Sequence, residues 1–311
     1  MANELFISFI IPALNEQQMI GDTLRAIKAA MGDCDHEIII SDNGSTDGTQ
    51  SIAESMDAKF IVNPTATIAE LRNLGVKESQ GNIYAFIDAD VSLAPDWLSV
   101  LKTLMATWPA DGMIVTGSTY LAPEASTFVE AHWFDLLRHS ESSYINSGHL
   151  ITTQAMFEKI NGFDASLRTA EDYDFCHRAQ QAGGQIVKRP ELRAIHHGFP
   201  KTVKEFMARE AWHGREDFRT FDKFINSKTA MAATLNLLIL VLAVLSLLQG
   251  SLANTIFYLL ASLGIAMVLT YLKFGVNVPN NFIKTALCFE IYLLGRMQSL
   301  YFRRRRPVAR T

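Results

Sequence analysis

The feature that most constrains this chain is a long stretch near its C-terminal end without a charged side chain. No Asp, Glu, Lys or Arg lies between Lys228 and Lys273. About 20 apolar residues cross the roughly 30 Å hydrocarbon core of a bilayer, so the stretch predicts two membrane spans, at 230–248 and 252–272. Because only residues 249–251 separate them, the spans form a helical hairpin whose ends emerge on the same side. The alternative, a hairpin buried inside a soluble protein, suits so long an uncharged run poorly.

A third apolar segment, at 282–302, differs from the two spans because it contains charged residues. Its polar side chains recur at helical spacing along one face, which is typical of a helix that lies in the membrane interface. Arginines follow it at 303–306, and lysines flank the hairpin. Basic residues stay on the cytoplasmic side of a membrane. The rest of the chain is therefore predicted to be cytoplasmic, and a bacterial inner membrane is the expected location.

Charge and cysteine content exclude other classes of protein. The formal net charge of -4 gives no sign of the basic surface that binds nucleic acid. Cys34, Cys176 and Cys288 lie far apart and lack the spacing of a structural zinc site or a disulfide framework, so a reducing compartment fits. The apolar run at 5–11 is followed at once by Pro12, which predicts a buried strand rather than a signal peptide.

Short apolar runs rich in Ile and Phe alternate with helical periodicity in the first part of the chain. Strands are predicted at 5–11, 37–40, 59–62 and 83–87. This alternation predicts an α/β fold with a mainly parallel, Rossmann-like sheet and helices on both faces. We assign this domain to residues 1–220 and a membrane-associated region to residues 221–311.

Polar side chains follow the first, second and fourth predicted strands directly, at 12–16, 41–45 and 88–90. Ligands of an open parallel sheet bind at the carboxyl ends of its strands, so these loops are expected to meet at one edge. Asp88 and Asp90 offer the oxygen ligands that Mg²⁺ or Mn²⁺ prefers. Two acids in a solvated turn give the same short pattern, so this pair alone is weak evidence.

The order of the motifs carries more weight than any one of them. They are Ser8 to Glu16, Ser41 to Thr49, Arg72-Asn73 with Gly75, Asp88-Ala89-Asp90, and Glu171-Asp172 after Gly162-Phe163-Asp164. This series, over roughly residues 5–220, resembles that of the family 2 glycosyltransferases with the GT-A fold. The resemblance implies a nucleotide-sugar donor, UDP- or GDP-linked, and a divalent metal, Mg²⁺ or Mn²⁺.

The resemblance also implies roles for residues around the donor. Glu16 and Asp42 would contact the base and ribose of the nucleotide, because carboxylates accept hydrogen bonds from ring N–H and sugar hydroxyl groups. The other implied residues are Pro12, which shapes the first loop, Arg72 and Asn73 near the base or diphosphate, Asp88 near the ribose and metal, and Asp90 as a metal ligand. Arg72 is alternatively an arginine on a helix surface.

Two more residues take roles from the resemblance. Asp172 matches the aspartate that acts as general base on the acceptor hydroxyl in an inverting displacement. As an alternative or in addition, Glu171 and Asp172 stabilise the N-terminus of a helix. His197 of the pair His196-His197 lies where many GT-A enzymes place a histidine near the metal or diphosphate, although a single histidine is more often structural.

The sequence departs from the family pattern at three places. The common Asp-Asp-Gly-Ser motif has Asn43 at its second position, so an amide replaces a carboxylate. The usual Gly-Gly-Phe-Asp begins with Asn161, which can accept the left-handed backbone that glycine would supply. The Gln-x-x-Arg-Trp signature of processive synthases is absent at 210–215, which argues against a polymer synthase.

Together these features predict an inverting, metal-dependent glycosyltransferase. Its acceptor would be a hydroxyl of a membrane-proximal molecule, lipid-linked or saccharide, in cell-envelope or exopolysaccharide synthesis. The first alternative is a polyprenyl-phosphate glycosyltransferase, whose phosphate acceptor requires no strong base. The second is a nucleotidyltransferase or a non-catalytic protein that binds sugar nucleotides. The loop at 12–18 disfavours a nucleotidyltransferase, since it is neither glycine-rich nor basic.

Overall fold

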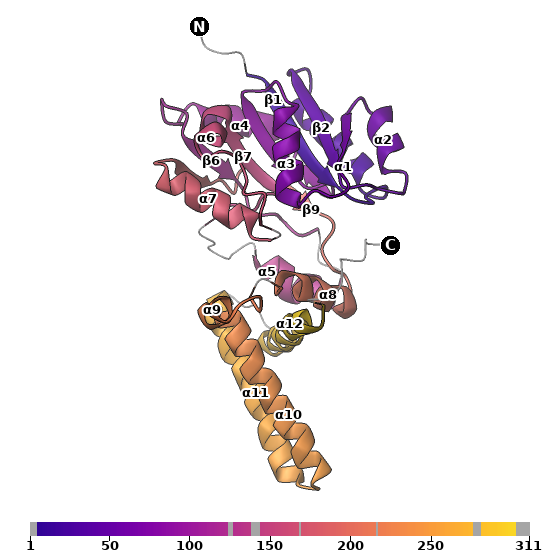
Figure 1. Cartoon of the computed structure of the whole chain (residues 1–311), viewed down its shortest axis with the longest axis vertical. Helices are drawn as coiled ribbons and strands as arrows, with labels where there is room; N and C mark the ends of the chain where they lie inside the picture. The colour runs from indigo at the N-terminus through magenta and orange to yellow at the C-terminus, as the bar shows by residue number, and fades with distance from the viewer. Residues whose placement is uncertain are drawn as a thin grey trace. The chain divides into compact units, whose positions relative to one another are not determined.

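The chain forms two compact units (Figure 1). The computed structural model describes residues 5–123, 127–137, 144–167, 169–215, 217–275 and 281–302. Unit 1 is formed mainly by Met1–Pro123 and Glu141–Gly198, and unit 2 by Glu124–Ser140 and Phe199–Val308. The division therefore differs from a single boundary near residue 220, because a segment around residue 130 joins the helical unit, which otherwise begins at residue 199.

Unit 1 is built on a seven-stranded sheet of order β3-β2-β1-β4-β7-β6-β8. The strands are β1 (Ile7–Ala13), β2 (His36–Asp42), β3 (Lys59–Val62), β4 (Ile83–Ile87), β6 (Ile114–Gly117), β7 (His149–Thr153) and β8 (Gln185–Lys188). β7 runs antiparallel to β4 and β6, and the other pairs are parallel. The prediction of a mainly parallel sheet is confirmed. Separately, β5 (Val91–Leu93) pairs antiparallel with β9 (Ala194–His196).

Helices cover both faces of this sheet, because side chains alternate between the faces along each strand. The helices of unit 1 are α1 (Ile20–Met31), α2 (Thr49–Ser55), α3 (Ile68–Lys77), α4 (Trp97–Met105), α6 (Gln154–Lys159) and α7 (Glu171–Gln181). α1, α2 and α4 share a buried cluster with Phe9 and Ile11 of β1. α3, α6 and α7 share a second cluster with Ile10 and Phe86. The sheet is thus sandwiched between two apolar cores.

Unit 2 is helical. It contains a π-helix, η1 (Glu130–Phe134), and the helices α5 (Asp135–Leu137), α8 (Val203–His213), α9 (Phe221–Asn226), α10 (Lys228–Leu248), α11 (Leu252–Phe274) and α12 (Phe282–Phe302). Among the described residues, α10 and α11 are the two helices that are long and apolar enough to cross a membrane. They enclose both predicted spans and form a hairpin (Figure 1).

α12 has the predicted bounds, but its polar side chains do not form one exposed face. Lys284 is exposed, whereas Cys288 and Ser299 are buried. The reason is packing within unit 2, where α12 contacts α8, α10 and α11. The arginines at 303–306 lie outside the described residues.

Three polar side chains join α10, α11 and α12. Asn236 Nδ2 donates to Glu290 Oε1 at 2.5 Å, and Ser262 Oγ lies 2.9 Å from both Asn236 Oδ1 and Glu290 Oε1. Asn236 and Ser262 are buried. Hydrogen bonds between helices help to fix helix packing in apolar surroundings, so these three residues attach α12 to both helices of the hairpin.

The second apolar core provides a test of the fold. Phe86 is fully buried and its ring centroid lies 5.0 Å from that of Phe163 and 5.9 Å from that of Phe157. Phe86→Ala is expected to lower the free energy of unfolding by about 3–5 kcal/mol, because it removes buried area and leaves a cavity. Thermal unfolding in detergent would measure the loss. Phe221→Ala is the control, since Phe221 is 75% exposed and its truncation should change stability little.

Candidate functional site

The loops after β1 and β2 are joined by hydrogen bonds. Asn15 N donates to Ser45 Oγ at 2.8 Å, Thr46 N to Asn15 Oδ1 at 2.9 Å, and Glu16 N to Thr49 Oγ1 at 2.8 Å. Asn15 adopts a left-handed backbone with φ of 56°, which asparagine tolerates better than most residues. Pro12, which precedes this loop, is buried in β1. These hydrogen bonds hold the two loops together as one ordered surface at the carboxyl ends of β1 and β2.

Asp42 and Asn43 organise the second loop. Asp42 is buried, and its Oδ1 accepts hydrogen bonds from Gly44 N at 2.8 Å and Ser45 N at 2.6 Å. Asn43 Nδ2 donates to the carbonyl oxygens of Asn63 at 2.9 Å and Ala66 at 3.0 Å. A carboxylate at position 43 has no N–H to donate to these carbonyls. The departure from Asp-Asp-Gly-Ser thus has a local structural reason.

Asp88, Asp90 and His196 form an acidic cluster beyond the end of β4. Their potential ligand atoms all lie within 4.8 Å of one another, and His196 Nε2 is 3.3 Å from Asp90 Oδ1. Two glycines press against the carboxylates. A Cβ at Gly148 would collide with the Asp88 carboxylate, and one at Gly198 with that of Asp90. Two carboxylates and an imidazole form a donor set that a divalent cation accepts, so the residues present fit a metal ion.

The structure places His196 in this cluster and not His197, the histidine that we expected there. His196 belongs to β9 and pairs with Val91. The His197 ring lies beside Ser92, with 2.9 Å between Nε2 and Oγ, and its backbone N donates to Asp90 O at 2.8 Å. Successive side chains point to opposite faces of a strand, so only one of two adjacent histidines reaches the cluster.

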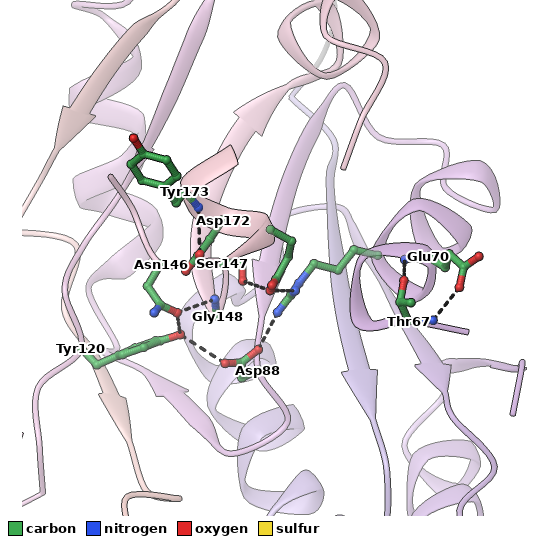
Figure 2. Close-up of polar contacts among 11 residues, drawn as sticks. Thr67, Glu70, Asp88, Tyr120, Asn146, Ser147, Gly148, Asp172 and Tyr173 are labelled. Carbon is green, nitrogen blue, oxygen red and sulfur yellow. Dashed lines mark hydrogen bonds and ion pairs between the residues drawn. The ribbon is translucent and has the colours of Figure 1, made fainter. Parts of the chain in front are cut away.

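Arg72 links the acidic cluster to the start of α7. α3 begins with a capping box of Thr67 and Glu70 (Figure 2), which places Arg72 in the second turn of the helix. Its Nη1 is 2.8 Å from Glu171 Oε1 and its Nη2 is 3.0 Å from Asp88 Oδ1. Burial alone would lower the pKa of Arg72, but Glu171 and Asp88 raise it. Arg72 is thus a buried, charged bridge, and not the surface arginine of the alternative prediction.

Asn73, the neighbour of Arg72, binds the turn before α7. Its Nδ2 donates to Phe163 O at 2.8 Å, and its Oδ1 accepts from Phe163 N at 2.9 Å. Both ends of the amide are engaged with backbone atoms. Asn161 in the same turn has φ of 59°, the left-handed conformation expected there.

Asp172 lies in the first turn of α7, next to Glu171. Ala170 precedes them with φ of 62°, a strained conformation for alanine that sets the direction in which the helix starts. Asp172 Oδ1 accepts from Tyr173 N at 2.8 Å. Desolvation, reinforced by the charge of Glu171, raises the pKa of Asp172 to about 6. A carboxylate with this pKa accepts a proton more readily than an ordinary one.

Tyr120 and Asn146 complete the site, although no motif or spacing predicted either residue. Tyr120 Oη lies 2.6 Å from Asn146 Oδ1 and 3.2 Å from Asp88 Oδ2 (Figure 2). Burial, with Asp88 nearby, raises the pKa of Tyr120 well above 10, so its hydroxyl remains a donor. Ser147 Oγ contacts Glu171 Oε1 at 3.2 Å. The contacts of Asn146 and Ser147 come from the segment before β7, a strand that no sequence pattern predicted.

β7 is anchored at its first residue by His149. Burial lowers the pKa of His149 to about 3, so the ring is neutral. Trp97 Nε1 donates to His149 Nε2 at 2.8 Å, which leaves the ring proton on Nδ1, 2.8 Å from Ser118 Oγ. These fixed contacts hold Gly148 against Asp88.

Sequence comparison identifies the family of this unit. Residues 8–159 match the family model described as Glycosyl transferase family 2. These residues form a family 2 glycosyltransferase domain. A pre-mycofactocin glycosyltransferase of Mycobacterium tuberculosis is 25% identical over 191 residues, 57% of this chain and 40% of that protein. An undecaprenyl-phosphate 4-deoxy-4-formamido-L-arabinose transferase of Pseudomonas syringae is 34% identical over 108 residues, 32% of each protein. The chain thus spans less than half the length of these two relatives.

Structure comparison supports the same fold. The chain is similar to the mannosyltransferase PcManGT from Pyrobaculum calidifontis, solved in complex with GDP-Man and Mn²⁺. The TM-score is 0.58 at 17% sequence identity, covering 95% of this chain and 87% of that one. At this identity the likeness concerns the fold alone, and it confirms the GT-A prediction.

The glycines beside the acidic cluster give a direct test of the site. Gly148→Ala and Gly198→Ala are expected to weaken Mn²⁺ binding at least tenfold, because each Cβ displaces one of the two carboxylates. Mn²⁺ affinity, measured by paramagnetic resonance on the purified protein, checks this. Gly264→Ala is the control, since nothing lies within 4 Å of the added Cβ. Unchanged Mn²⁺ affinity in both site variants would show that the ion binds elsewhere.

The raised pKa of Asp172 predicts that removing the charge of this side chain stabilises the folded protein, and more strongly at high pH than at low pH. A folded-state pKa near 6 exceeds that of an unfolded aspartate, about 3.9. The favourable contribution of the protonated group is therefore complete below about pH 4 and is lost as the pH rises through about 6. Asp172→Asn should raise the Tm more at pH 7.5 than at pH 4.5. Asp33→Asn, at an exposed position, should show no such difference, and an equal gain at both pH values for Asp172→Asn would contradict the prediction.

Proposed function

We propose that this protein is an inverting, metal-dependent glycosyltransferase that moves a sugar from a UDP- or GDP-linked donor to a hydroxyl of a membrane-proximal acceptor. One observation carries the proposal. Within one unit, a metal-ligand cluster of Asp88, Asp90 and His196 is connected through buried Arg72 to Glu171, the neighbour of a carboxylate with a raised pKa. The match of residues 8–159 to glycosyltransferase family 2 supports it. So does the Mn²⁺ and GDP-Man complex of the mannosyltransferase of similar fold.

The residues divide between donor and acceptor. The joined loops with Glu16 and Asp42 would receive the nucleotide, and Asp88, Asp90 and His196 would hold Mg²⁺ or Mn²⁺. When bound, the ion would stabilise negative charge on the departing diphosphate. Asp172 would accept the proton of the acceptor hydroxyl as that oxygen attacks the anomeric carbon. Arg72 would hold Asp88, on the donor side, and Glu171, on the acceptor side, at a fixed distance from each other.

A second function is favoured by one relative. The Pseudomonas syringae protein is named as an undecaprenyl-phosphate transferase. A phosphate acceptor is already ionised and requires no strong base, so a transfer of that kind would not depend on Asp172. The raised pKa of Asp172 favours the hydroxyl acceptor, because an unused carboxylate at this position only lowers stability near neutral pH.

Unit 2 suggests where the reaction takes place. We infer that α10 and α11 cross a bacterial inner membrane as a hairpin, with both ends on the cytoplasmic side. Lys273 lies in the last turn of α11, with its Nζ 4.4 Å from the ring centroid of Trp133 and 5.3 Å from that of Tyr292. Aromatic rings and lysines of this kind gather at membrane interfaces. An interfacial α12 is compatible with this placement, and a lipid-linked or membrane-proximal acceptor would then be within reach.

Sugar transfer by the purified protein tests the proposal. Hydrolysis or transfer from UDP- and GDP-sugars should require Mg²⁺ or Mn²⁺ and disappear with a chelator. Asp90→Ala should lower kcat at least a hundredfold, because it removes a metal ligand, while Asp33→Asn serves as a control. No metal-dependent turnover of any nucleotide sugar, with Asp90→Ala indistinguishable from the native protein, would refute the function.

Asp172→Asn then separates the two acceptor classes in the same assay. For a hydroxyl acceptor, kcat should fall by about 100-fold or more, with the donor Kd unchanged, because the general base is lost. For a phosphate acceptor, kcat should stay near normal. A polyprenyl phosphate and a sugar alcohol, assayed side by side, identify the acceptor class.

A further inference from the structure

Asn146 is an exposed side chain in an otherwise buried segment of unit 1. Its neighbours Ile145, Ser147 and Gly148 are buried, whereas Asn146 itself is exposed. The segment leads into β7, which is antiparallel to β4, so it lies at the carboxyl end of β4, where the acidic cluster is found. One polar side chain of this segment is therefore open to solvent beside the cluster.

The amide of Asn146 is held in one orientation. Its Oδ1 lies 3.2 Å from Gly148 N and 2.6 Å from Tyr120 Oη (Figure 2). A backbone N–H can only donate, so the amide atom that faces Gly148 is the oxygen and not the nitrogen. Within the described residues, no hydrogen bond uses Nδ2. Asn146 therefore offers two free N–H donors from a fixed position.

Both halves of the site meet at this segment. Tyr120 Oη also lies 3.2 Å from Asp88 Oδ2, on the side of the metal ligands. Ser147 Oγ donates to Glu171 Oε1 at 3.2 Å, on the side of the proposed base Asp172. Burial raises the pKa of Tyr120, and the charges of Asp88 and Asp172 raise it further, so both carboxylates act on one hydroxyl. The exposed amide, bonded to that hydroxyl, is thus placed where the two halves meet.

The transferred sugar would occupy the same place. In an inverting displacement, the attacking oxygen and the departing group lie on opposite faces of the anomeric carbon. The sugar ring therefore lies between the ligands of the metal, which would hold the diphosphate, and the base Asp172. A sugar hydroxyl oxygen accepts hydrogen bonds. Amide donors that are already fixed bind such an oxygen with little further loss of side-chain freedom.

We propose that Asn146 Nδ2 donates a hydrogen bond to a hydroxyl oxygen of the transferred sugar, and that Tyr120 is a positioning residue that holds the amide. This assignment rests on the proposed function, because it requires a nucleotide-sugar donor in the site. The nucleotide and the diphosphate are left to other residues. Asn146 should therefore distinguish a nucleotide sugar from its own nucleoside diphosphate.

Binding to the full-length protein with Mn²⁺, measured by calorimetry, tests the proposal. The probes are UDP-glucose, UDP-N-acetylglucosamine, UDP-galactose, GDP-mannose, UDP and GDP. The readout is the Kd of the best-bound nucleotide sugar divided by the Kd of its nucleoside diphosphate. Asn146→Asp keeps an oxygen at Oδ1 but has no N–H to donate, so this ratio should rise about fivefold to tenfold, as expected for the loss of one hydrogen bond. Asn226→Asp, the same change at an exposed position of unit 2, is the matched control and should leave the ratio unchanged.

Two further variants separate the hydrogen bond from charge and from misfolding. The added charge of Asn146→Asp weakens the binding of any diphosphate, but the ratio removes this effect because it acts on both ligands. Asn146→Ala adds no charge and should raise the ratio to a similar extent. Tyr120→Phe keeps the ring but releases one of the two contacts of the amide, so the ratio should rise less, by about twofold to fivefold. Native binding of the nucleoside diphosphate by the last two variants would show that they are folded.

The outcomes distinguish this proposal from the proposed function. A native ratio in both Asn146→Asp and Asn146→Ala would show that Nδ2 contacts no sugar, which overturns the assignment and leaves the glycosyltransferase function standing. A native ratio in Tyr120→Phe, beside a raised ratio in the Asn146 variants, would overturn the positioning role of Tyr120. If the native protein binds no nucleotide sugar of the panel, both the proposed function and the role of Asn146 are wrong.

Discussion

The arrangement of unit 1 depends on the guanidinium of Arg72, which is buried between Asp88 and Glu171. These residues come from α3, from the end of β4 and from the start of α7, so one side chain fixes three segments that are far apart in the sequence. A buried cation is tolerated only when it is paired and hydrogen-bonded. Any shift of α7 or of the loop after β4 would leave the charge of Arg72 buried without a partner carboxylate. The two carboxylates are therefore held at opposite ends of one rigid group.

Much of the fold could be predicted from the sequence, because apolar runs and short motifs are local features of the chain. Strand runs such as Ile83–Ile87 and Lys59–Val62 were located to the residue, since apolar runs bounded by polar loops are typical of buried parallel strands. The motif order predicted the GT-A fold. It also predicted that Asp88 and Asp90 would face the carboxyl edge of the sheet. The hairpin followed from residue counting alone.

The remainder depends on contacts between residues distant in sequence. β7 enters the sheet antiparallel between β4 and β6, and nothing in its five residues indicates that neighbour. Gly148 and Asn146, which directly precede β7, are brought to the site by this pairing. The choice between His196 and His197 likewise depends on the register of β9 against β5. The membership of residues near 130 in unit 2 depends on aromatic packing, such as that of Trp133 on Tyr292 at 4.5 Å.

The hydrogen bonds among Asn236, Ser262 and Glu290 limit how freely the hairpin could be exchanged for another pair of helices. A hairpin that only holds a domain at a membrane can be exchanged for any other apolar pair of helices. Here the hairpin offers an amide and a hydroxyl to a carboxylate of α12. A substituted hairpin without these groups would leave Glu290 facing apolar side chains. The hairpin and α12 therefore form one packing unit, and a chimera has to transplant them together.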